Sequence, residues 1–359
     1  MQRRNRIGWI EWARVLGAVG VVVLHVLTSS FMKVPEDISD VRLAGYIVVS
    51  VVFGRWAVPS FFMITGYLLL APMKDLRWPR AWGYAKRMIL VLLTFGLFFS
   101  LLEEAALCVN GGEPLSPRVF LRAVVDVLTA SSWDHLWYVY ALIGVYALSP
   151  FVRRLLDRLG KRRFTTMTLV LFVVVMVIPT GFRLWQGFFG PGVDVAPTGA
   201  VALLANIPIG LACFCLGGCL RYWRPRHLLP VALVATACVA TMTVVALTGL
   251  FAEGYGDMGF VYLQGSCFAC IYAVCVLTML RQTAGDDPMA SDAIAARLAE
   301  DSFGIYVIHP LYVHIVLLAT NPLAFPPVLY EAAFVIIVLA VSDLSTRALR
   351  HVPLIRSLL

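Results

Sequence analysis

The first apolar stretch of this 359-residue sequence holds two residues that could do chemistry together, Arg14 and His25. Eleven helical positions of about 100° each bring them within about 20° of one another, so both lie on one face, about 16 Å apart along the axis. Glu11 stands three residues before Arg14 and can pair with it. A planar guanidinium suits a phosphate, and an imidazole suits proton transfer near neutral pH. We therefore predict that Glu11, Arg14 and His25 form a catalytic group.

The spacing of this pair also limits what it can bind. If the helix begins near Gly8, Arg14 lies about 9 Å and His25 about 26 Å along it. Their separation is comparable to the extended pantetheine arm of coenzyme A, so the cation could hold phosphates while the imidazole meets a thioester. The alternative is that the two side chains extend to the headgroups at opposite surfaces of a membrane. Their shared face and the neighbouring acid favour the functional interpretation.

The second apolar stretch contains Arg55 and then Pro59, Thr65 and Gly66. A charge this deep in an apolar segment is expected to face the interior of a bundle. Pro59 removes a backbone hydrogen bond and Gly66 allows close approach, which predicts a kinked helix beside a cavity. For Thr65 and Gly66, ordinary packing through small residues is an equally good explanation.

Two further segments carry polar groups in apolar surroundings. Asp134, His135 and Tyr138 open the fourth apolar stretch, where an interfacial role is the alternative. His309 lies in the ninth stretch, directly before Pro310. The eight cysteines form no convincing metal or redox site, and we interpret them as small buried side chains.

The elements that must position these residues are membrane helices. The chain is 60% hydrophobic and only 14% charged, with a mean hydropathy of +0.84. Soluble domains are about 25% charged, so the composition excludes an ordinary soluble enzyme. We predict an all-α polytopic bundle forming one domain over residues 1–359, with about ten spans at 8–28, 44–71, 88–108, 135–152, 164–181, 199–220, 228–250, 259–280, 302–320 and 328–349.

The basic residues predict the orientation of these spans. Alternate connections hold most of the Lys and Arg, whereas the opposite connections hold only Lys33, Arg42, Arg118, Arg122 and Arg183. The positive-inside rule then places both termini in the cytosol. The net charge of +8 follows from this orientation, so we predict no nucleic-acid partner. Although a basic start precedes the first apolar stretch, no clear cleavage site follows, and we predict a retained helix rather than a signal peptide.

The order of these segments resembles the acyltransferase-3 family of bacterial inner-membrane proteins, in particular its O-acetyltransferases of surface or lipid-linked glycans. The segments that carry the resemblance are Arg14 and His25 with their ten-residue gap, Val58–Leu69, His135–Tyr138 and Ser302–His309. Glu11 stands where Asp is common and Thr65 where Ser is common, and the proline often found soon after the basic cluster of the third span is absent.

The resemblance implies an inner-membrane enzyme that takes an acyl group, usually acetyl, from cytosolic acyl-CoA to a carbohydrate hydroxyl on the other side. It implies that His25 is the essential residue, with Arg14 beside it. We assign the cofactor site to Arg14, Arg55, Thr65, Lys86 and Arg87. We assign the acceptor site to Asp134, His135, Tyr138 and His309, and expect no metal.

We predict that His25 is the general base, although an acyl-histidine intermediate and a homodimer both stay open. The first rival is a transporter or flippase of a glycan or small molecule, which would have the same composition. The second is another membrane acyltransferase fold with its essential histidine elsewhere, for instance His309.

Overall fold

The computed structural model shows a bundle of helices. The structure describes residues 7–33, 38–72, 74–112, 114, 116–129, 133–189, 199–252, 259–263, 265–285 and 293–359. No strand occurs among these residues. The helices are α1 (Gly8–Lys33), α2 (Asp40–Val49), α3 (Ala57–Leu69), α4 (Trp78–Val91), α5 (Leu97–Asn110), α6 (Pro117–Leu128), α7 (Trp137–Phe172), α8 (Ile178–Phe189), α9 (Gly199–Leu220), α10 (Leu228–Phe251), α11 (Cys267–Ala284), α12 (Ala293–Ala319), α13 (Pro327–Leu349) and α14 (Pro353–Arg356).

Short π-helical turns join α2 to α3, α4 to α5 and α7 to α8. The described residues contain eight helices that are long and apolar enough to cross a membrane. One of them, Trp137–Phe189, has 53 residues and would be about 80 Å long if straight, more than twice the thickness of a bilayer core. Gly160 divides it, with φ 71° and ψ 170°. Helix α9 adds the apolar segment Ala205–Leu220. The predicted all-α polytopic fold is confirmed, and these two features reconcile eight helices with about ten spans.

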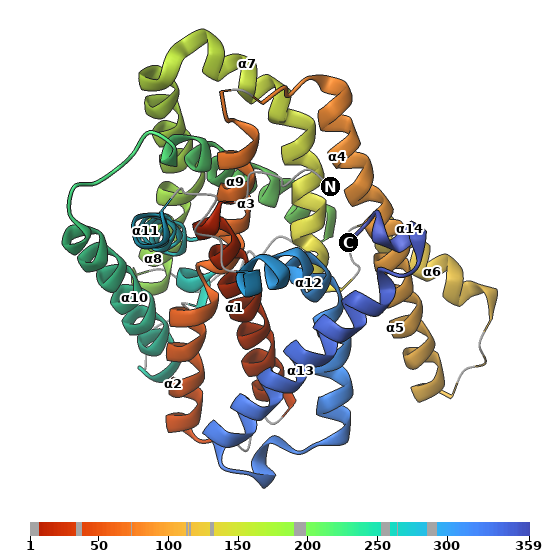
Figure 1. Cartoon of the computed structure of the whole chain (residues 1–359). Coiled ribbons are helices and arrows are strands. Elements are labelled where there is room, and N and C mark those ends of the chain that lie inside the picture. Colours follow the sequence, from red (N-terminus) through yellow and green to blue (C-terminus); the bar gives the residue numbers. More distant parts are fainter. Residues whose placement is uncertain are drawn as a thin grey trace.

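Helix α1 lies in the middle of the bundle. It packs against α3, α11, α12 and α13, and Figure 1 shows it in dark red between α3 and the blue C-terminal helices. Because it is surrounded by protein, its residues meet other side chains on most of its faces. Trp9 and Ala13 are 1% and 0% exposed near its start, and Val22 and Val26 are both 0% exposed further along. A polar residue on α1 therefore points into the bundle far more readily than into lipid.

The predicted kink in the second span is present, but it lies before Pro59 rather than at it. The helix leaves the α conformation over Ser50–Gly54 and turns at Arg55 and Trp56 before α3 begins at Ala57. The ring of a helical proline clashes with the carbonyl four residues earlier, which here belongs to Arg55. Pro59 therefore accounts for the position of the break.

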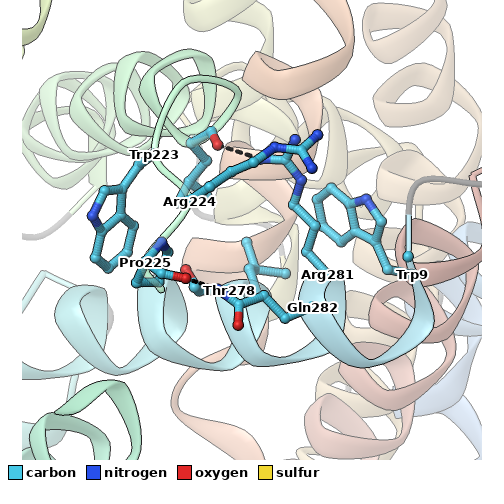
Figure 2. Close-up of a pocket in the computed structure, with 10 residues that line it drawn as sticks. Trp9, Trp223, Arg224, Pro225, Thr278, Arg281 and Gln282 are labelled. Atoms are coloured by element: carbon cyan, nitrogen blue, oxygen red, sulfur yellow. Dashed lines mark hydrogen bonds between the residues drawn. The ribbon is translucent and has the colours of Figure 1, made fainter. Parts of the chain in front are cut away.

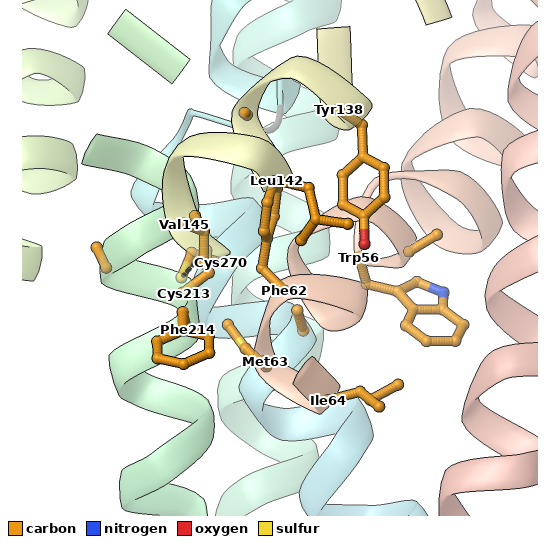
Figure 3. Packing of buried hydrophobic residues seen from close by; sticks show 14 of the residues in the cluster. Trp56, Phe62, Met63, Ile64, Tyr138, Leu142, Val145, Cys213, Phe214 and Cys270 are labelled. Atoms are coloured by element: carbon orange, nitrogen blue, oxygen red, sulfur yellow. Dashed lines mark hydrogen bonds between the residues drawn. The ribbon is translucent and has the colours of Figure 1, made fainter. Parts of the chain in front are cut away.

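Gly66 serves helix packing. A Cβ atom there would lie 1.8 Å from the carbonyl oxygen of Phe214 on α9, and one at Gly217 would lie 1.9 Å from that of Met63. The two backbones therefore touch, and the apolar side chains of α3, α7, α9 and α11 close around them (Figure 3). Phe62 packs on Tyr138 with 4.6 Å between ring centroids, so this contact fixes a residue of the predicted acceptor site. The packing interpretation is correct for Gly66.

Contacts between connections agree with the predicted alternation of the two membrane sides. Arg153 donates to the carbonyls of Ala71 and Pro72, and Arg221 donates to that of Tyr67, all at the end expected to be cytosolic. At the other end, Arg42 donates to the carbonyl of Pro322 at 2.9 Å and forms an ion pair of 3.2 Å with buried Glu331. Connections assigned to one side thus meet each other, whereas the identity of each side stays a prediction.

Some predicted connections are helical in the structure. Arg80, Lys86 and Arg87 were expected before the third span, but they lie on α4. From Trp78 to Asn110 the helix runs for 33 residues, about 50 Å, so it is longer than the bilayer is thick and its polar part extends beyond it. Similarly, residues 293–301 lie in the predicted connection between the spans 259–280 and 302–320, but they belong to the start of α12; residues 286–292 lie outside the described part.

Candidate active site

A cavity of about 870 Å³ opens beside α1 among α3, α4, α7, α12 and the segment after α13. Its described lining includes four arginines and a single acidic side chain, Glu300. The basic residues are Arg14, Arg87, Arg350, Arg356 and His351; the other polar ones are Thr65, Tyr138, Tyr146, Ser302, Tyr306 and Ser357. Such a lining attracts an anion, and the volume is within the usual range of about 300–1,000 Å³ for small-molecule sites.

The predicted cofactor residues divide into two groups. Arg14, Thr65 and Arg87 line the cavity, Arg14 from α1, Thr65 from α3 and Arg87 from α4. Lys86 is exposed outside it, because neighbouring positions on a helix point about 100° apart. Arg55 is partly buried at the turn before α3 and does not line the cavity. The donor-site role predicted for each of these residues stays a prediction.

His25 lies further along α1 and faces protein, but it does not line this cavity. Its ring packs against that of His309 at 4.8 Å between centroids and an interplanar angle of 69°. The ring of His309 is 6.2 Å from that of Tyr306, which does line the cavity. Arg14 and Tyr306 thus line the same cavity, Tyr306 lies near His309, and His309 packs on His25. Arg14 and His25 therefore do not share one continuous cavity wall, although they were predicted to act together from one face of the helix.

The backbone fixes which nitrogen of His309 carries a proton. Pro310 has no N–H, so the carbonyl of Tyr306, four residues earlier, lacks its helical donor. Nδ1 of His309 fills that place at 2.8 Å and also lies 3.1 Å from the carbonyl of Ile305. Because a carbonyl oxygen only accepts, Nδ1 bears the proton and Nε2 keeps a lone pair. That Nε2 atom is buried, with no hydrogen-bond partner among the described residues, on a side chain that is 0% exposed.

The same reasoning applies to His25. Its Nδ1 lies 2.8 Å from the carbonyl of Val21 one turn earlier, so Nδ1–H donates there and the neutral ring has its lone pair on Nε2. A neutral imidazole with a fixed tautomer is the form that a general base requires.

Three of the predicted acceptor residues, His135, Tyr138 and His309, lie close together, and with His25 and Tyr306 they form what we call the histidine cluster. His135 is 3% exposed, its Nε2 donates to the carbonyl of Val307 at 3.1 Å, and its ring lies 5.8 Å from that of His309. Tyr138 lines the cavity and its ring is 5.4 Å from that of Tyr306. The structure thus brings together residues that are up to 284 positions apart, from His25 to His309. The side chain of Asp134 lies outside the described part of the structure.

The remaining candidates lie away from the cavity lining. Glu11 is 7% exposed and buried near the start of α1. All eight cysteines are free thiols; the two sulfurs of Cys213 and Cys270 lie 3.8 Å apart in the apolar interior. Within the described residues, no group of three or more His, Cys, Asp or Glu side chains has the arrangement of a metal site.

A second cavity of about 330 Å³ lies beside the start of α1, next to α11 and the connection between α9 and α10 (Figure 2). Trp9, Trp223, Arg224 and Arg281 are among the residues around it. Arg281 donates to the carbonyl of Leu220, and Figure 2 draws this bond. Trp9 precedes Arg14 by five positions, about 140° around the helix, so the two cavities use different faces of α1.

The large cavity is also lined by four residues that were not predicted from the sequence: Tyr146, Tyr306, Arg350 and Arg356. Tyr306 carried a detectable signal, since it stands three positions before His309 and therefore on the same face. Tyr306 also donates a hydrogen bond to the carbonyl of His135. Arg350 and Arg356 follow the last span and could not be told apart from charges that orient the chain.

A family model described as an acyltransferase domain matches residues 7–347, which is nearly the whole chain. No curated protein and no solved structure matches it. The matched range contains α1 with Arg14 and His25, as well as the histidine cluster and most of the cavity lining. The chain therefore belongs to the acyltransferase-3 family and is a multi-pass membrane acyltransferase.

Proposed function

We propose that the chain transfers an acyl group, in the first instance acetyl, from acyl-CoA to a hydroxyl of a cell-surface or lipid-linked carbohydrate. The cavity would open to the cytosol and the acceptor would approach from the other side of the bacterial inner membrane. One observation carries this proposal. Arg14 lies on an arginine-lined cavity while His25, on the same helix, packs against a buried histidine.

The described residues fit a coenzyme A thioester. Arg14 and Arg87 would hold its pyrophosphate, because guanidinium groups donate two parallel hydrogen bonds to phosphate oxygens. Tyr138 would donate or accept hydrogen bonds along the polar amides of the arm, and Thr65 would accept one, because its hydroxyl already donates to the carbonyl of Phe61. Since about 16 Å of helix separates Arg14 from His25, the thioester end would reach past Tyr306 to the histidines. Rotation of that side chain would open the path.

In the transfer step, Nε2 of His25 would take the proton of the acceptor hydroxyl as the oxygen attacks the thioester carbon. The carbon–oxygen bond forms, the carbon–sulfur bond breaks, and the thiolate takes the proton from the imidazolium. His309 would assist, because its unpartnered Nε2 can accept a hydrogen bond from the protonated His25 ring. His135 and Tyr138 would bind the acceptor.

The direct test uses the purified full chain in lipid nanodiscs, with labelled acetyl-CoA and a carbohydrate acceptor pool from the cell envelope. We expect His25→Ala to lose about 10²–10⁴-fold in turnover. Arg14→Ala should mainly raise the KM for acetyl-CoA. His227→Ala removes an exposed histidine before α10 and serves as the matched control. Turnover by His25→Ala at the wild-type rate would remove the mechanism, and glycan movement into vesicles without acyl turnover would favour a transporter.

A further inference from the structure

The residues after α13 form part of the large cavity, although they lie beyond the range 7–347 that the family model matches. We call residues 350–359 the strap. The strap contains the short helix α14 and contributes Arg350, His351, Arg356, Ser357 and Leu359 to the cavity lining. In Figure 1 α14 lies beside α4 and the end of α13.

The strap is fastened at both of its ends. At its start, Arg350 donates to the carboxylate of Asp301, a residue of α12 that is only 3% exposed. At its end, Leu358 and Leu359 are 2% and 6% exposed, and Arg87 donates from Nε to the carbonyl of Leu358 at 3.0 Å. A charge-assisted hydrogen bond and two buried apolar side chains hold the strap in place across the cavity.

Between these anchors, Arg356 takes no part in the fastening. Its side chain is exposed at the rim of the cavity and makes no ion pair or side-chain hydrogen bond with the described residues. His351 lies on the same rim, also exposed. An arginine held on a fixed segment at the mouth of a basic cavity is placed to receive an anion from an entering ligand.

The order of the chemical groups along coenzyme A indicates which of its phosphates would reach Arg356. If the thioester lies at His25 and the pyrophosphate at Arg14, the remaining phosphate of coenzyme A, on the ribose, extends outward to the rim. We propose that Arg356, with His351 beside it, binds this ribose 3′-phosphate monoester. The strap then selects complete coenzyme A thioesters over donors that lack this group, such as dephospho-coenzyme A thioesters. The inference rests on the proposed function and adds a specificity site to it.

The test compares kcat/KM for acetyl-CoA and for 3′-dephospho-acetyl-CoA in the full chain in nanodiscs. We expect wild type to prefer acetyl-CoA by about 10- to 100-fold, the range of a hydrogen bond between charged groups. Arg356→Gln should remove most of this preference through a higher KM for acetyl-CoA, with an unchanged kcat and an unchanged KM for the dephospho donor. Arg356→Lys should keep part of the preference.

Arg154→Gln is the matched control, because Arg154 is an exposed arginine on α7 that does not line the cavity. It should keep the full preference. Turnover in which wild type does not distinguish the donors, or in which Arg356→Gln retains the preference, would overturn the strap site alone. Absence of wild-type turnover with either donor would overturn the proposed function itself.

Discussion

Substitutions at His309 and Pro310 can distinguish the roles of the two ring nitrogens of His309. Nδ1 supplies the donor that Pro310 withholds from the carbonyl of Tyr306, and Nε2 faces the interior next to His25 without a partner among the described residues. His309→Phe keeps the ring and loses both nitrogens. A second substitution, Pro310→Ala, restores a backbone N–H for the Tyr306 carbonyl.

The magnitudes follow from these contacts. In His309→Phe, the buried Tyr306 carbonyl loses its donor, which costs about 1–3 kcal/mol of stability. The Pro310→Ala addition should recover most of that loss. Turnover should behave differently, because the missing Nε2 no longer accepts from the protonated His25 ring. A hydrogen bond to a charged group is worth about 1.5–3 kcal/mol, which corresponds to about 10- to 150-fold in rate.

Thermal unfolding in detergent and acetyl-transfer kinetics, measured on the same preparations, distinguish the two effects. We expect His309→Phe to be unstable and slow, and His309→Phe/Pro310→Ala to be stable and still slow. If the double variant regains wild-type turnover, His309 acts only on the backbone, and its assistance to His25 is refuted. If His309→Phe is as stable as wild type, the tautomer assignment is wrong.

Two further predictions test the bundle that holds the site. Gly66→Ala puts a Cβ 1.8 Å from the Phe214 carbonyl oxygen and should lower the free energy of unfolding by about 1–3 kcal/mol or more. Gly83→Ala is the control, because a Cβ there has nothing within 4 Å, and it should be neutral or stabilising. Thermal unfolding of both variants measures the difference, and equal stability would contradict the close packing of α3 on α9. Glu331→Gln breaks a buried pair with Arg42 and should cost about 3–5 kcal/mol in the same assay. Glu104→Gln, in a half-exposed pair at 3.6 Å, should change stability by less than about 1 kcal/mol, and a similar loss in both variants would refute this difference.

Much of the fold follows from the sequence because a bilayer allows so few alternatives. Apolar segments of about 20 residues in this setting become helices, since every backbone polar group must be satisfied within the segment. The predicted ranges 199–220 and 328–349 therefore agree closely with α9 and α13. The break before Pro59 was also predictable, because a proline acts on a backbone carbonyl at a known distance along the chain.

What the sequence left open depends on contacts between distant segments. The spacing of Arg14 and His25 predicted one face of one helix, but only packing decides what stands between them. Tyr306 comes from α12, and its place beside both the cavity and the histidine cluster depends on how α12 crosses α1. Likewise, Lys86 and Arg87 are neighbours of equal charge in the sequence, and only the rotation of α4 puts one on the cavity and the other outside.

The strap marks a different kind of limit. Its arginines follow a membrane span on the side where positive charge is expected for orientation alone, so composition explains them without any ligand. The structure gives them unequal surroundings: Arg350 is held by buried Asp301, whereas Arg356 stays exposed on the cavity rim. A charge that only orients a chain needs no fixed position. A ligand that binds at the mouth of the cavity therefore better explains why Arg356 lies there on an anchored segment.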